Sequence, residues 1–87
     1  MAFSLPMPEP FKQQGWKAKI RDKEVLESPY VTIMRGVKVW RLSLRDGKFM
    51  DQGSSWRGIP GEVREEVERN WRLLHTAWDQ IYPENPV

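Results

Sequence analysis

The chain has 87 residues and no cysteine, which is the size of one small domain and excludes disulfide frameworks, thiolate nucleophiles and cysteine-based metal sites. With 39% hydrophobic and 30% charged residues, its composition is that of a folded globular chain. The net charge of +2 hides an asymmetry, because residues 1–58 carry 11 Lys and Arg against six Asp and Glu, whereas residues 59–87 carry three against six.

The N-terminal segment is rich in proline. Residues 1–14 contain Pro6, Pro8 and Pro10 at alternate positions, which favours an extended, polyproline-like chain and disfavours helix. The segment lacks the basic start and apolar middle of a signal peptide, and no apolar run in the chain approaches the roughly 18 residues of a membrane span. We predict a flexible Pro-rich tail at 1–14, a single domain at 15–82, a loose tail at 83–87, and a cytoplasmic protein that does not bind membranes.

Three segments have the alternation of half-buried strands. Residues 16–21, WKAKIR, place apolar and basic side chains on opposite faces, and residues 30–34, YVTIM, form a β-branched run. A third strand is predicted at 37–45 after a turn at Arg35 and Gly36. Asp46 and Gly47 then predict a type I′ hairpin turn into a return strand that begins at 48–50. The four segments indicate a small antiparallel meander.

The C-terminal part predicts one long amphipathic helix. Pro60 stands where a helix favours its first residue, and Pro83 ends the pattern. Between them one apolar stripe recurs at helical spacing: Val63, Val67, Trp71, Leu74, Trp78 and Ile81. A half-apolar sheet and an amphipathic helix each cover the other's apolar face. The predicted fold class is therefore α+β, a three- to four-stranded antiparallel meander packed on one long C-terminal helix.

Packing the helix on one face leaves the other face of the sheet basic. Its predicted members are Lys17, Lys19, Arg21, Arg41, Arg45 and Lys48. Such a face could track a phosphate backbone, with Tyr30 as a candidate for exposure beside it. The alternative is that these cations keep an uncovered sheet solvated and discourage edge pairing.

The loop at 51–59 contains a second candidate site. Trp56 and Arg57 lie between glycines and serines, and an aromatic side chain beside arginine is typical of binding loops. The competing interpretation is that Trp56 folds back and closes one end of the core.

Catalytic chemistry finds little support in the sequence. His75 is the single histidine, and general-base catalysis needs an orienting partner within reach. Ser54 and Ser55 lack the nucleophile-elbow setting, and the glycines around Trp56 lack the lysine of a phosphate-binding loop. We therefore expect a protein that is not an enzyme and that uses no cofactor or metal.

Residues 27–33, ESPYVTI, followed by a short hairpin and a C-terminal helix with tryptophan near its end, carry a resemblance to a known group. The chain resembles small uncharacterised bacterial α+β proteins whose second strand reads roughly Pro-Pro-His-x-His-Val. The resemblance covers residues 16–80 in element order and implies an α+β fold and an accessory or toxin–antitoxin-associated role. Pro29 matches, whereas Tyr30 and Thr32 occupy the two histidine positions, so no ligand role of those histidines carries over.

Taken together, the sequence predicts a non-enzymatic accessory or protein-interaction domain, either a monomer or a weak homodimer, whose main partner is another protein. The alternative function is a weak nucleic-acid-binding module that uses the basic sheet face.

Overall fold

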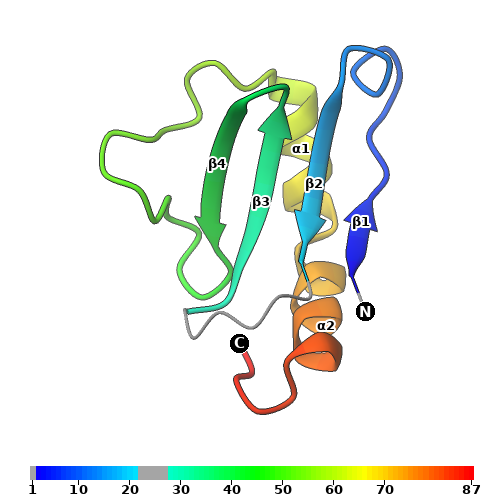
Figure 1. Ribbon diagram of the computed structural model, residues 1–87. Coiled ribbons are helices and arrows are strands. Elements are labelled where there is room, and N and C mark those ends of the chain that lie inside the picture. Colours follow the sequence, from blue (N-terminus) through cyan, green and yellow to red (C-terminus); the bar gives the residue numbers. More distant parts are fainter. Residues whose placement is uncertain (1, 22–27) are drawn as a thin grey trace.

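The structure is a computed structural model that describes residues 2–21 and 28–87. Its elements are β1 (Phe3–Leu5), β2 (Trp16–Ile20), β3 (Tyr30–Arg35), β4 (Lys38–Ser43), α1 (Gly61–Arg69) and α2 (Trp71–Ile81). The strands form one antiparallel sheet in the order β1-β2-β3-β4, and both helices lie on the same side of it (Figure 1). The α+β class and the antiparallel meander are confirmed.

The register of the sheet decides which side chains meet the helices. Ala18 pairs with Ile33, and Ile33 pairs with Trp40 on the next strand. The neighbouring row joins Lys19, Thr32 and Arg41. Because successive side chains point to opposite faces of a sheet, the first row faces the helices and the second lies on the opposite face, as the alternation in β2 predicted.

The core lies between the helix-facing side of the sheet and the two helices. Nine apolar residues of the predicted strands and of the helical stripe are fully buried: Ile20, Val31, Ile33, Leu42, Leu44, Val63, Val67, Leu74 and Trp78. Four others, Trp40, Phe49, Trp71 and Ile81, are partly buried and pack against the core. Further buried side chains lie outside these strands and this stripe, among them Leu5, Met7 and Ile59.

The N-terminal segment belongs to the fold, and the prediction of a flexible tail at 1–14 is wrong for its described part. Phe3 and Leu5 pair with Ile20 and Ala18 of β2. Leu5 is 4% exposed and Met7 is 7% exposed, so the segment contributes apolar side chains to the core. The predicted domain boundary at residue 15 therefore moves towards the N-terminus.

The C-terminal segment is also attached, against the prediction of a loose tail at 83–87. The indole Nε1 of Trp78 donates to the carbonyl of Asn85 at 2.7 Å, and the amide of Val87 donates to Asp79 Oδ1 at 2.8 Å. Arg45 Nη2 donates to the carbonyl of Pro86 at 3.1 Å. These contacts tie the segment both to α2 and to the hairpin after β4.

The predicted single long helix is two helices, separated at Asn70. This residue has φ −103° and ψ 22°, and its side-chain Nδ2 donates to the carbonyl of Glu66 at 2.8 Å and to Glu66 Oε2 at 2.9 Å. Asparagine side chains compete with the helical backbone for hydrogen bonds in this way. The apolar stripe continues across the break, because Val67 precedes it and Leu74 follows it, and both are buried.

Both predicted hairpins form, but with other turns. Arg35 pairs with Lys38, so Gly36 and Val37 are the central residues of the first turn. Gly36 has φ +60° and Val37 has no positive φ, as in a type II′ turn. Gly47 has φ +71°, whereas Asp46 has no positive φ, which excludes type I′. The amide of Gly47 donates to the carbonyl of Ser43, so this turn is longer than two residues. The predicted return strand at 48–50 is reduced to one bridge, between Leu42 and Phe49.

Candidate functional site

The predicted basic residues do not form one continuous free patch. Three of them, Lys17, Lys19 and Arg21, lie at alternate positions along β2 and just beyond it. Lys17 and Arg21 are exposed, and Lys19 is half-buried. These three cations keep the arrangement that the alternation of residues 16–21 predicted.

Arg41 lies on the same face of the sheet but is neutralised. Its Nη2 is 2.6 Å from Asp51 Oδ1, and its Nε donates to Asp51 Oδ2 at 3.1 Å. These hydrogen bonds hold the pKa of the Asp51 carboxyl below its ordinary value. The guanidinium of Arg41 also lies 5.7 Å from the ring centroid of Tyr30, which itself packs on Trp78 at 5.8 Å. Tyr30 is therefore half-buried between two side chains and does not offer a free ring for base stacking.

Arg45 and Lys48 lie on the hairpin after β4, away from the β2 cations. Arg45 holds the C-terminal segment through the carbonyl of Pro86. Lys48 is exposed, and its backbone amide donates to Asp46 Oδ1 at 3.0 Å, which lowers the pKa of that carboxyl. The structure thus divides the six predicted cations into a β2 group and three residues on or near the β4 hairpin.

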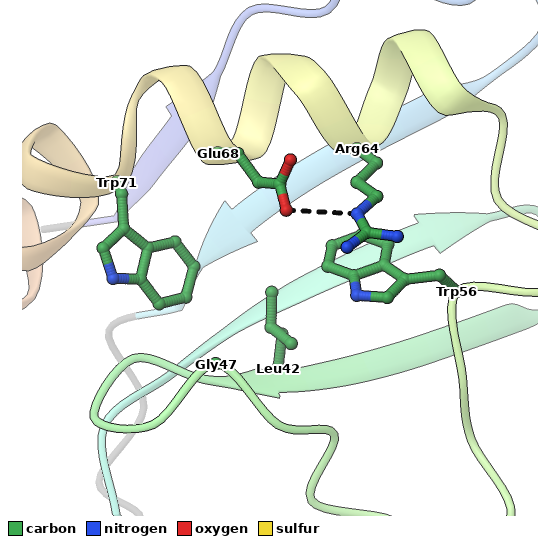
Figure 2. Close-up of a pocket in the computed structure, with 6 residues that line it drawn as sticks. All are labelled: Leu42, Gly47, Trp56, Arg64, Glu68 and Trp71. Atoms are coloured by element: carbon green, nitrogen blue, oxygen red, sulfur yellow. Dashed lines mark hydrogen bonds and ion pairs between the residues drawn. The ribbon is translucent and has the colours of Figure 1, made fainter.

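An open pocket of about 320 Å³ lies between α1 and the segment that follows β4. We call it the tryptophan groove, and its lining residues are Leu42, Gly47, Trp56, Arg64, Glu68 and Trp71. In Figure 2 the two indoles stand at opposite ends of the groove, Leu42 lies between them on the sheet side, and Arg64 and Glu68 project from the helix above. The groove therefore combines an apolar floor and aromatic ends with one pair of opposite charges.

Trp56 both packs on the protein and borders the groove. The packing agrees with the interpretation that it folds back onto the core, whereas binding through this loop stays a prediction. The ring of Trp56 meets Phe49 edge-on with centroids 5.0 Å apart, and it is half-buried. Arg57 beside it is exposed, and the amide of Arg57 donates to Ser55 Oγ at 3.2 Å. Because the indole is fixed by Phe49, the side of the ring that borders the groove is presented by a rigid contact.

The charged pair is organised around the indole of Trp56. The guanidinium of Arg64 lies 4.8 Å from the Trp56 ring centroid, and its Nε donates to Glu68 Oε2 at 3.1 Å. Arg64 and Glu68 have 47% and 52% of their side-chain area exposed, so the ion pair itself adds little stability. Its geometric effect is to hold a cation over the ring at the mouth of the groove.

Trp71, Arg64 and Glu68 were not predicted as site residues. Trp71 belongs to the apolar stripe and was assigned to the core, whereas the other two are exposed helix positions. Their positions on the stripe and beside it predict the helix face but not the pocket, because the opposite wall comes from the distant hairpin loop. The size of Trp71 was the available signal, since a large ring at the margin of a stripe tends to remain half-exposed.

His75 shows no catalytic arrangement with the residues around it. It is half-buried, its ring lies 5.5 Å from that of Trp71, and its Nε2 is buried without a hydrogen-bond partner in the described part of the chain. Within residues 2–21 and 28–87, no group of three His, Asp or Glu side chains is placed to hold a metal ion. In the same ranges, the structure has no helix with the length and apolar character that a bilayer crossing requires.

Comparison with known proteins gives no further guide to this site: no known protein family, curated protein or solved structure matches the chain. The resemblance to the Pro-Pro-His-x-His-Val group therefore stays a prediction.

Proposed function

We propose that this protein is a non-enzymatic accessory domain that binds a partner protein through the tryptophan groove. The observation that carries this proposal is the pairing of two half-buried tryptophans, Trp56 and Trp71, at the two ends of an open pocket. Tryptophan is enriched among the residues that dominate binding energy, above all where it flanks a pocket that a partner side chain can fill.

The size and lining of the groove suit one or two partner side chains. Covering the exposed parts of both indoles and the edge of Leu42 would remove apolar surface from water, worth about 25 cal/mol for each Å². A partner side chain that enters between the rings would gain this free energy from its contacts with both indoles. The lining also gives the partner an orientation, because the charged pair Arg64 and Glu68 stands on the helix side, opposite to Leu42 on the sheet side.

The alternative function, weak nucleic-acid binding through the basic sheet face, has less support. Arg41 is engaged by Asp51, Arg45 by Pro86, and Tyr30 by Trp78. What remains is the β2 group of Lys17, Lys19 and Arg21, which has no free aromatic ring beside it for base stacking among the described residues. A cytoplasmic location and a monomer or weak homodimer remain parts of the proposal, and a sizing column tests the second.

Site-directed photo-crosslinking in cells tests the proposal. A benzophenone amino acid is placed at Glu68, which lines the groove, and in a control at Val37, which is 98% exposed at the opposite end of β4. We expect a defined protein adduct from position 68 that disappears when Trp71→Ala is added, and no such adduct from position 37. Equal adducts from both positions, or an adduct insensitive to Trp71→Ala, would contradict the proposal.

A further inference from the structure

The Trp56 end of the tryptophan groove already holds a guanidinium group that belongs to the chain itself. The guanidinium of Arg64 lies 4.8 Å from the centroid of the Trp56 ring, and Arg64 Nε donates to Glu68 Oε2 at 3.1 Å. Figure 2 shows the guanidinium over the indole, with the Glu68 carboxylate beside it. An aromatic ring face and a carboxylate both favour a cation. We call the Trp56 ring face and the Glu68 carboxylate the guanidinium site, and Arg64 fills it.

The two walls of the guanidinium site come from different parts of the chain and are held independently of Arg64. Trp56 is positioned by its edge-on contact with Phe49, with ring centroids 5.0 Å apart. Glu68 belongs to α1, and within residues 2–21 and 28–87 it pairs with no cation other than Arg64. If Arg64 turned away, the site would present one negative charge beside an aromatic face.

Arg64 is held in the guanidinium site by contacts that can be exchanged. Arg64 and Glu68 have 47% and 52% of their side-chain area exposed. Ion pairs and cation–π contacts at such exposed positions are weak, so the long side chain of Arg64 can turn into water at little cost. The groove borders both Arg64 and Trp56, and another group can therefore reach the same ring from the open side of the groove.

We propose that the guanidinium site binds an arginine side chain of the partner protein, which replaces Arg64 on Trp56. This inference rests on the proposed function of the tryptophan groove and names the chemistry of the partner. The incoming guanidinium stacks on the Trp56 ring and donates to Glu68, as Arg64 does in the free protein. Arg64 is then an internal competitor, and the free protein is autoinhibited at this end of the groove.

The contacts that Arg64 makes favour arginine over other groups of a partner. A carboxylate in the same place would face Glu68 with a like charge. An apolar side chain there would cover the ring but leave Glu68 without the hydrogen bond that it now accepts. A guanidinium is planar, so it can stack on an aromatic face and donate to a carboxylate at the same time. Leu42 and Trp71 remain available to an apolar neighbour of that arginine in the partner.

Nuclear magnetic resonance with two short peptides tests this inference. The peptides are capped Gly-Arg-Gly and the same peptide with citrulline, the neutral isostere of arginine. Each of the five tryptophans gives one indole signal in a proton–nitrogen correlation spectrum, and Trp56→Phe assigns the signal of Trp56. Both peptides are titrated into the wild-type protein, Arg64→Ala and Arg64→Ala/Glu68→Gln. The matched control is Arg69→Ala, which removes an arginine that pairs with Glu66 on the same helix. Circular dichroism verifies that all the proteins are folded.

We expect the arginine peptide to shift the Trp56 signal of Arg64→Ala and to bind this variant at least about threefold more tightly than the wild type, because the internal competitor is gone. Adding Glu68→Gln should weaken this binding by about two- to fivefold. Arg69→Ala should bind as the wild type does. The citrulline peptide should bind Arg64→Ala more weakly than the arginine peptide, because it carries no charge.

Three results would overturn the inference: equal binding of the two peptides to Arg64→Ala, a Trp56 signal that neither peptide moves in this variant, or equal binding of the arginine peptide by Arg64→Ala and the wild type. The photo-crosslinking experiment is independent of these results, because its probe replaces Glu68 and so removes one wall of the guanidinium site. A defined adduct from position 68 without arginine binding would overturn this inference and leave the proposed function standing.

Discussion

Arg41 and Asp51 form a bidentate ion pair that ties the middle of β4 to the loop after the hairpin, with N···O distances of 2.6 and 3.1 Å. The amide of Met50 donates to the carbonyl of Arg41 at 2.9 Å, so backbone and side chain fasten the same two segments. This pair removes a cation from the predicted basic face and fixes the start of the loop that continues to Trp56.

Asp51→Asn should lower the free energy of unfolding at neutral pH by up to about 1 kcal/mol, because both side chains are about one-third or more exposed and water screens the pair. The folded-state pKa of Asp51 is lowered, so its stabilising contribution is present above the unfolded pKa, about 4, and is lost as the pH falls through the folded value. Urea unfolding of both proteins at several pH values should show the difference shrinking below about pH 4. Glu84→Gln, in the exposed C-terminal segment, serves as the control, and a difference independent of pH would contradict the assignment.

Leu5→Ala should destabilise the protein by about 2–3 kcal/mol, because it removes a side chain that is 4% exposed and leaves a cavity beside Ala18. Thermal or urea unfolding measures the loss. Ser4→Ala, at the exposed position of the same strand, should change stability by less than about 0.5 kcal/mol. If the two variants were equally stable, β1 would not be packed on the core.

Gly47→Ala should lower the free energy of unfolding by about 1–2 kcal/mol, because Gly47 has φ +71° and an added Cβ disfavours that conformation. Among the described residues other than its chain neighbours, no atom would lie within 4 Å of this Cβ, so the cost arises from the backbone alone. Gly61→Ala, at the first residue of α1, should be neutral or stabilising by up to about 1 kcal/mol. Opposite signs for the two glycines in urea unfolding would support the left-handed conformation of Gly47, and equal signs would not.

Removing residues 85–87 should lower the free energy of unfolding by about 1–3 kcal/mol, because the indole N–H of Trp78 loses the carbonyl of Asn85. Trp78 is 2% exposed, so water replaces this acceptor poorly. A shorter truncation that removes only residues 86 and 87 retains the Trp78 bond and should cost less. Unfolding followed by tryptophan fluorescence measures both proteins, and equal losses would show that the bond to Asn85 is unimportant.

The strands were predictable where apolar and polar residues alternate strictly over several residues, and they were missed where the strand is short. Residues 16–20 and 30–35 alternate or carry β-branched side chains, and both are strands. β1 spans three residues and is followed by prolines, so its local pattern resembles a tail, and its strand character comes from pairing with β2. The hairpin at Gly47 was located correctly by its glycine. Its turn is longer than predicted, because the amide of Ser43 donates to the carbonyl of Lys48 across it, and no local pattern indicates that pairing.

The helices and the site also show that a local sequence pattern does not predict features that depend on tertiary packing. The stripe that contains Val67, Trp71 and Leu74 predicts which face is buried, yet it carries no information about the break at Asn70, because the spacing continues across it. The tryptophan groove joins a helix to a loop, and the pairing of Arg41 with Asp51 joins a strand to that loop. Such contacts depend on how the elements pack against one another. A sequence pattern therefore indicates which residue types are present, but not which residues come into contact.

The order of strands in the sheet is the order of strands in the chain, and this has a consequence for the folding rate. Every ladder joins consecutive strands, so each pairing closes a loop between neighbours and costs little chain entropy. Proteins whose contacts are local in sequence fold faster than those with distant pairings. The sheet can therefore assemble by successive hairpins, and the contacts of longest range, those of α2 with the sheet, complete the fold.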